Sequence, residues 1–115
     1  MPKLRYLDVS GRLGGDESVR ALADWPALAS VEQLNLCESD LTEKGAEYLA
    51  QSQHLSTLKE LDVWSNELGP EGIFSLVNAD WADSLTHLDA WGNLIGDDGV
   101  KAIARSSKLT SLRSL

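Results

Sequence analysis

The sequence predicts an α/β repeat fold in which every unit consists of a β-strand followed by an α-helix. Similar segments begin at Leu4, Val31, Leu58, Leu85 and Leu112, so the pattern returns every 27 residues. Counted from those first residues, apolar side chains at unit positions 4 and 6 alternate as they do in a strand. Apolar side chains at positions 16, 19 and 20 instead follow helical spacing. The regular period and the change of spacing within each unit together predict the fold.

The predicted strands account for much of the leucine content, because leucine makes up 20 of the 115 residues. Position 4 is always leucine, and position 6 is apolar in each of the four full units, as Val9, Leu36, Val63 and Ala90. Side chains at positions 4 and 6 of a strand point to one face, and those at positions 3, 5 and 7 point to the other. We therefore expect the leucines in the core and positions 3, 5 and 7 on an exposed surface.

The predicted helices have the expected chemistry at their starts. Thr42 is a candidate N-cap, and Pro70 stands at a favourable first helical position. Acidic residues occupy the first turns, where they interact favourably with the positive end of a helix, as Asp16, Glu17, Glu43, Glu71, Asp97 and Asp98. These features place one helix in each of the four full units.

The pattern L-x-x-L-x-L-x-x-N-x-L is clearest in residues 58–68 and 85–95. It resembles leucine-rich repeats of the ribonuclease-inhibitor-like class, in a short, bacterial-style form of 27 residues, and the resemblance covers Leu4 to Leu115. The resemblance implies a right-handed curved solenoid, with a parallel β-sheet on the concave face, α-helices on the convex face, and a role in protein binding. We expect residues 1–115 to form a single domain, with units 4–30, 31–57, 58–84 and 85–111 and a partial fifth unit, 112–115.

Two departures from the pattern affect the first half of the chain. The asparagine at position 9, which the resemblance implies satisfies backbone groups between turns, is present as Asn66 and Asn93 but replaced by Ser39 and Arg12. In the first unit the segment Leu13-Gly14-Gly15 is shifted by one residue. Terminal repeats are often atypical because they cap the core, although a misplaced alignment of this unit is the alternative explanation.

The exposed strand positions form a predicted grid that is acidic in its centre and aromatic along one edge. Tryptophan contributes strongly to interfaces, so we predict Trp64 and Trp91 as binding anchors; covering the edge of the core is the alternative. The acidic column is interpreted as a site for a basic partner or, alternatively, as a solvated sheet face. Trp25 and Trp81, near helix ends, are expected to pack beneath the returning segments. The grid contains Tyr6, Gln33, Glu60 and His87 at position 3, Asp8, Asn35, Asp62 and Asp89 at position 5, and Ser10, Cys37, Trp64 and Trp91 at position 7.

Charge and composition exclude several classes of partner. The net charge is −8 and most of the excess lies in units 31–57 and 58–84, which opposes binding to nucleic acid. The apolar segment 72–79 is too short to span a membrane, and the N-terminal residues have no apolar signal core. A single cysteine, Cys37, excludes an internal disulfide, so we expect a cytoplasmic protein.

The sequence gives little support for catalysis, and we predict no enzyme activity, cofactor or metal. His87 and Asp89 resemble half of an acid–base pair, but no nucleophile lies beside them, since Cys37 is two strands away. Cys37 is expected to be a small, partly buried side chain. The glycine-rich turns lack the Gly-Lys-Ser/Thr ending of a phosphate-binding loop. Carboxylates spaced one per strand rarely converge as closely as calcium requires.

We therefore predict a non-catalytic protein–protein interaction module that binds a basic and apolar protein or peptide surface on its concave face. The alternative is a structural assembly element that packs end to end with further repeats or copies of itself. It is motivated by the poorly covered Leu112 and Leu115, which are expected to permit self-association. The predicted binding residues are Trp64, Trp91, Asp62, Asp89, Glu60, His87, Asn35, Asp8 and Tyr6.

Overall fold

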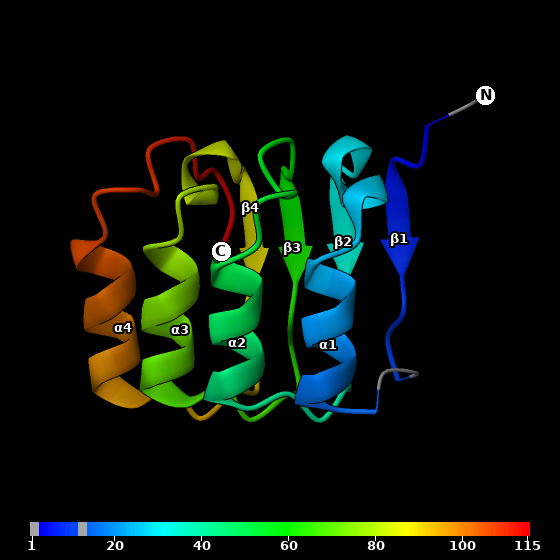
Figure 1. Cartoon of the computed structure of the whole chain (residues 1–115). Coiled ribbons are helices and arrows are strands. Elements are labelled where there is room, and N and C mark those ends of the chain that lie inside the picture. The colour runs from blue at the N-terminus through cyan, green and yellow to red at the C-terminus, as the bar shows by residue number, and fades with distance from the viewer. Residues whose placement is uncertain (1–2, 12–13) are drawn as a thin grey trace.

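The computed structural model describes residues 3–11 and 14–115, and its strands form one parallel sheet (Figure 1). The order is β1-β2-β3-β4, so neighbours in sequence are neighbours in the sheet. Leu7, Leu34, Leu61 and Leu88 are aligned directly across the strands, as the 27-residue period predicts. The strands are β1 (Tyr6–Asp8), β2 (Gln33–Asn35), β3 (Glu60–Asp62) and β4 (His87–Asp89).

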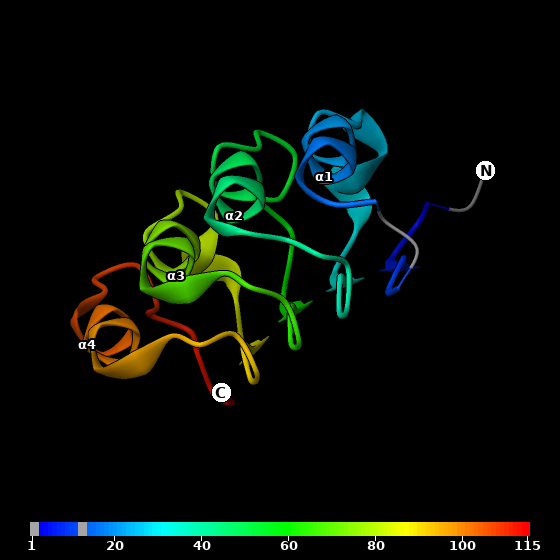
Figure 2. The ribbon, with the colours of Figure 1, turned by 90° about the horizontal axis from the view of Figure 1, so that it is seen from below.

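The helices form a second layer on one face of the sheet (Figure 1). Seen along the strands, the helices spread over a wider arc than the strands do (Figure 2). Neighbouring strands lie about 4.8 Å apart whereas packed helices need about 8–10 Å, so stacking such units curves the sheet inwards. This arrangement confirms the predicted curved α/β solenoid. The helices are α1 (Asp16–Ala23), α2 (Glu43–Ala50), α3 (Gly69–Val77) and α4 (Gly96–Arg105), with 3₁₀ helices η1 (Pro26–Ser30) and η2 (Ala82–Ser84).

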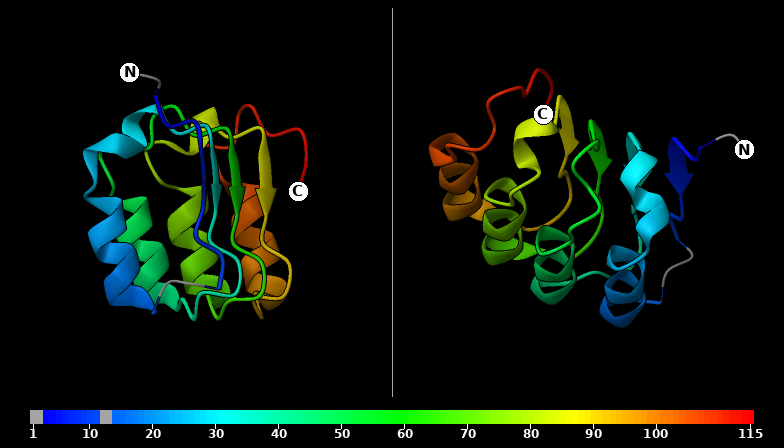
Figure 3. Two further views of the ribbon diagram at one scale, coloured as in Figure 1. Left: turned by 90° about the vertical axis from the view of Figure 1, so that its right-hand side faces the viewer. Right: turned by 45° about the horizontal axis from the view of Figure 1, so that its top comes forward.

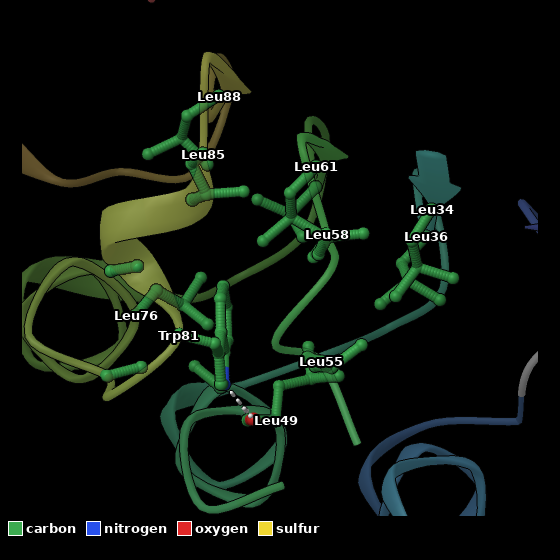
Figure 4. Close-up of a cluster of buried hydrophobic side chains, with 14 of the residues drawn as sticks. Leu34, Leu36, Leu49, Leu55, Leu58, Leu61, Leu76, Trp81, Leu85 and Leu88 are labelled. Atoms are coloured by element: carbon green, nitrogen blue, oxygen red, sulfur yellow. Dashed lines mark hydrogen bonds between the residues drawn. The ribbon is translucent and has the colours of Figure 1, made fainter. Parts of the chain in front are cut away.

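The core lies between the two layers and consists mainly of the aligned leucines and the apolar faces of the helices (Figure 4). Trp81 is 4% exposed, and its indole N–H donates to the carbonyl of Leu49 in the preceding unit at 3.0 Å. The expected burial of Trp81 is therefore confirmed. The same expectation is wrong for Trp25, which is 44% exposed. Trp81 packs back onto α2, whereas no helix precedes the unit of Trp25 among the described residues.

The asparagine at position 9 links each unit to the preceding one. The side-chain oxygen of Asn66 accepts hydrogen bonds from the backbone N–H groups of Ser39 and Leu41 at 2.9 and 3.1 Å. Its amide nitrogen donates to the carbonyls of Leu36 and Val63 at 3.0 and 2.8 Å. Asn93 makes corresponding bonds, accepting from the Leu68 N–H and donating to the carbonyls of Val63 and Ala90. The role that the resemblance implied for this asparagine is confirmed.

The departures in the first half of the chain have limited structural effect. The buried hydroxyl of Ser39 donates to the carbonyl of Cys37, so this residue bonds within its own turn. Arg12 and Leu13 lie outside the described residues. Helices α1 and α2 begin 27 residues apart, at Asp16 and Glu43, so the expected one-residue shift does not extend into the first helix. Thr42 is the N-cap of α2, as predicted, and its side chain accepts a hydrogen bond from the N–H of Lys44.

Candidate functional site

The candidate site is the concave face, which we define as the side chains at positions 3, 5 and 7 of the four full units. The four helices lie on one side of the sheet (Figure 3, left). The leucines at position 4 are packed in the core, so the alternation of a strand directs positions 3 and 5 to the other side. The observed register aligns Tyr6, Gln33, Glu60 and His87 in one row, and Asp8, Asn35, Asp62 and Asp89 in a second. The structure therefore brings the predicted binding residues onto one surface.

Two tryptophans mark the edge of the concave face where the strands end. Trp91 is 75% exposed, whereas Trp64 is partly buried. The N–H of Ser65 donates to the carbonyl of Trp91 at 2.9 Å, and the N–H of Glu38 donates to the carbonyl of Trp64 at 3.2 Å. These bonds hold the segments after the strands side by side, so the two tryptophans occupy equivalent places in neighbouring units. Trp91 presents most of its indole to solvent.

Most of the position 5 residues shape the turn that follows each strand. Asp8 accepts hydrogen bonds from the N–H and hydroxyl of Ser10 at 2.9 and 2.6 Å. Asn35 accepts from the N–H of Cys37 at 3.0 Å, and Asp89 accepts from the N–H of Trp91 at 3.1 Å. The residue at position 8, which follows these N–H donors, has a positive φ in all four units. These residues are Gly11, Glu38, Ser65 and Gly92. Short Asp and Asn side chains stabilise such turns, which is a role that the sequence interpretation missed although the residue types indicate it.

Asp62 differs from the other position 5 residues because it pairs with a side chain on the next strand. The Nε2 atom of His87 lies 3.5 Å from Oδ1 of Asp62. Burial raises the pKa of the Asp62 carboxyl, the nearby Asp89 and Glu60 raise it further, and His87 opposes the shift. Asp62 is therefore a partly buried carboxylate with acidic neighbours, and a cation from a partner would relieve their repulsion.

The raised pKa of Asp62 predicts that replacing this residue stabilises the protein at neutral pH. An aspartate whose pKa is higher in the folded state contributes stability at low pH, and that stability is lost as pH rises through the folded pKa. Like charges on neighbouring strands are unfavourable, so Asp62→Asn is expected to raise the free energy of unfolding at pH 7 by up to about 1 kcal/mol. Urea unfolding at pH 7 and pH 3 measures the effect, and a gain of equal size at both pH values would contradict it.

Cys37 lies at position 7 but does not contribute a reactive group to the face. Its side chain is buried, and burial together with the acidic column raises the thiol pKa to about 12. A thiol with this pKa is protonated at neutral pH and is a poor nucleophile.

In the described part of the chain, no group of three or more His, Cys, Asp or Glu side chains is placed to hold a metal ion. None of the helices described is both long and apolar enough to cross a bilayer.

Comparisons with known proteins agree with the geometry. A family model described as Leucine Rich repeat matches residues 54–77 and 84–104. The solved structure of leiomodin-1 actin-binding site 2 (ABS2) is similar over 99% of this chain and 70% of that chain, with a TM-score of 0.83 and 20% identity. The tropomodulin C-terminal domain of Caenorhabditis elegans is similar over 96% of this chain and 71% of that chain, with a TM-score of 0.67 and 21% identity. No curated protein matches the sequence. At these identities the structural similarities establish the fold alone.

Proposed function

We propose that this chain, which matches a Leucine Rich repeat family model at residues 54–77 and 84–104, is a non-catalytic binding module whose concave face holds a basic and apolar surface of a protein or peptide. The exposed indole of Trp91 is the observation that carries this proposal. A large aromatic side chain contributes little to stability while it remains in water, and tryptophan is enriched among residues that dominate binding energy. We also propose a cytoplasmic location, where the thiol of Cys37 remains reduced.

The chemistry beside Trp91 supports a partner that offers lysine or arginine. Asp62 and Asp89 stand on neighbouring strands at directly paired positions. A cation placed between them would relieve their mutual repulsion, and its side chain would lie close to the tryptophan edge. Cation–π contact with an indole adds about 0.5–2 kcal/mol, depending on how far the cation is desolvated. A basic residue next to an apolar one in the partner would use both features.

The binding experiment compares variants on an immobilised array of peptides that combine lysine or arginine with leucine or an aromatic residue. We expect Trp64→Ala/Trp91→Ala to weaken the selected peptides at least 100-fold while the far-UV circular dichroism spectrum stays unchanged. Because Trp64 is partly buried, the single variant Trp91→Ala provides a second measure that leaves the core intact. Trp25→Ala, a change at a tryptophan 44% exposed and outside the face, is the matched control. Unchanged affinity in both Trp91 variants would disprove the proposal.

Actin is the first natural protein to test as a partner, because one similar structure is named an actin-binding site. Co-sedimentation of the wild-type chain with filamentous actin, repeated with Trp91→Ala, gives a direct result. We expect the wild type to sediment with actin and the variant to remain in the supernatant. Binding that is the same for both proteins would place any actin contact outside the concave face.

A second candidate function is end-to-end assembly, which exposed apolar side chains on α4 and in the segment that pairs with β4 favour. Val100 is 58% exposed and Leu115 is 65% exposed. Gly99 is the single fully buried residue of α4, so this helix is less covered than α2 or α3. Packing against another repeat or a second copy would cover these side chains. Light scattering after size exclusion distinguishes the possibilities, since a strict monomer at high protein concentration would exclude self-assembly. Under this alternative, Val100→Ser is expected to reduce the assembled fraction.

A further inference from the structure

A groove of about 770 Å³ crosses the ends at which the strands begin. The tryptophan edge lies at the opposite ends of the strands. The lining of the groove comes from three successive units and includes the segments that enter β1, β2 and β3. Lys3, Arg5 and Lys59 supply its cations, Glu32 supplies a carboxylate, and residues of η1 including Pro26 and Ala29 supply an apolar wall. We call this surface the basic groove.

The basic groove concentrates positive charge on an acidic protein. Three of the ten lysine and arginine residues line it, although the whole chain carries a net charge of −8. Glu32 lies between two of these cations, with Oε2 at 3.9 Å from Nε of Arg5 and Oε1 at 3.4 Å from Nζ of Lys59. The Arg5 and Lys59 side chains remain 80% and 60% exposed, so both stay accessible to a ligand.

Three of the four hydroxyl-bearing residues that line the groove donate their hydroxyl protons within the fold, and the fourth is the exposed Ser56. Ser30 donates to the carbonyl of Leu4, Thr57 donates to the carbonyl of Ala29, and Ser84 donates to the carbonyl of Leu58. These bonds hold the lining segments in place, and the hydroxyl protons of these three residues are not free to bind a ligand. Recognition of an anion therefore depends mainly on the lysine and arginine side chains.

The spacing of the cations favours an extended chain over a compact anion. Arg5 and Lys59 directly precede β1 and β3, which are two strands apart, and this corresponds to about 10 Å at about 4.8 Å per strand. A compact anion placed midway would meet the Glu32 carboxylate. In a polyproline II segment, with three residues per turn and a rise of about 3.1 Å, residues i and i+3 lie on the same face about 9 Å apart. Such a segment places one carboxylate near each cation and a neutral residue near Glu32.

We propose that the basic groove binds an extended acidic peptide segment of a partner protein, with two carboxylates three residues apart facing Arg5 and Lys59. Lys3 adds charge at the end occupied by Arg5. The proline and alanine side chains of η1 provide a surface for the residues between the carboxylates. Because the charged side chains are exposed, binding weakens as salt screens them. The groove and the concave face would then take partners of opposite charge.

Fluorescence anisotropy of a labelled peptide containing Glu-Pro-Pro-Glu tests the proposal, with Glu-Glu-Pro-Pro as a probe of the same composition and charge. We expect the first peptide to bind at least fivefold more tightly than the second. Arg5→Ala/Lys59→Ala is expected to weaken it at least tenfold, and Glu32→Gln to strengthen it. The matched control Lys44→Ala/Lys101→Ala removes the same charge from exposed helix positions outside the groove and is expected to have no effect. Circular dichroism confirms that each variant is folded.

Four outcomes would overturn the proposal. Equal affinity for the two peptides would remove the spacing requirement, and equal loss in both double variants would reduce the effect to net charge. Displacement of the peptide by an equal concentration of inorganic phosphate would indicate a simple anion site. Sedimentation with anionic lipid vesicles that requires Arg5 and Lys59, without peptide binding, would assign the groove to a membrane surface.

Discussion

Replacing Asn66 with alanine is expected to lower the free energy of unfolding by about 3–5 kcal/mol, because it leaves the buried backbone N–H groups of Ser39 and Leu41 without their acceptor. The carbonyls of Leu36 and Val63 lose a donor at the same time. Each unsatisfied buried group costs about 1–3 kcal/mol, and the site lies in the middle of the stack, where it joins the second unit to the third. Urea unfolding followed by far-UV circular dichroism measures the loss.

Two further variants separate this effect from the general cost of removing an asparagine. Asn78→Ala deletes an exposed amide that donates to the carbonyl of Phe74, and we expect a cost within about 0.5 kcal/mol. Asn66→Ser should fall between Asn66→Ala and the wild type, since Ser39 occupies the equivalent position in the second unit. If Asn66→Ala costs no more than Asn78→Ala, the asparagine bonds do not hold the units together.

The 27-residue period accounts for the success of the fold prediction, because it determines which residues become neighbours across the sheet. Once Leu7, Leu34, Leu61 and Leu88 are aligned, their burial and the exposure of positions 3, 5 and 7 follow from the alternation of a strand. The role of Asn66 also follows, since a buried amide on a turn must bond to nearby backbone groups.

The period does not determine which partner each side chain selects within a column. Asp89 and Asp62 both occupy position 5, yet Asp89 accepts a hydrogen bond from the Trp91 backbone whereas Asp62 pairs with His87. The difference arises because the fourth unit has a histidine at position 3. A column therefore identifies neighbours, and the side chains around each member decide its bonds.

The basic groove was missed because its residues lie in the segments between the patterned positions. Arg5, Glu32 and Lys59 all stand at position 2 of their units, so a column of charge was visible in the sequence. Its position beside η1 was not, because the pattern did not predict a 3₁₀ helix there. Trp25 shows the same limit, since it occupies a place near a helix end as Trp81 does but is 44% exposed.

Binding and stability are expected to respond in opposite directions at Asp62. Replacement by asparagine removes repulsion from Asp89 and stabilises the fold, but it also removes a carboxylate from the proposed partner site. A carboxylate that lowers stability at neutral pH has no structural benefit comparable to the turn bonds of Asp8 or Asp89. This contrast makes Asp62 the acidic residue of the face for which a binding role has the strongest physical argument.

Replacing Trp81 with alanine is expected to lower the free energy of unfolding by about 3–5 kcal/mol, since a large buried side chain is removed from between two units. Trp81→Phe retains an aromatic ring but loses the N–H bond to Leu49, so a smaller loss of about 1–2 kcal/mol is expected. Trp25→Ala is the matched control, and its 44% exposure predicts a cost below that of either buried change. Guanidinium unfolding followed by circular dichroism ranks the three variants. Equal costs for Trp25→Ala and Trp81→Ala would show that the packing of Trp81 onto α2 adds nothing specific to the stability of the stack.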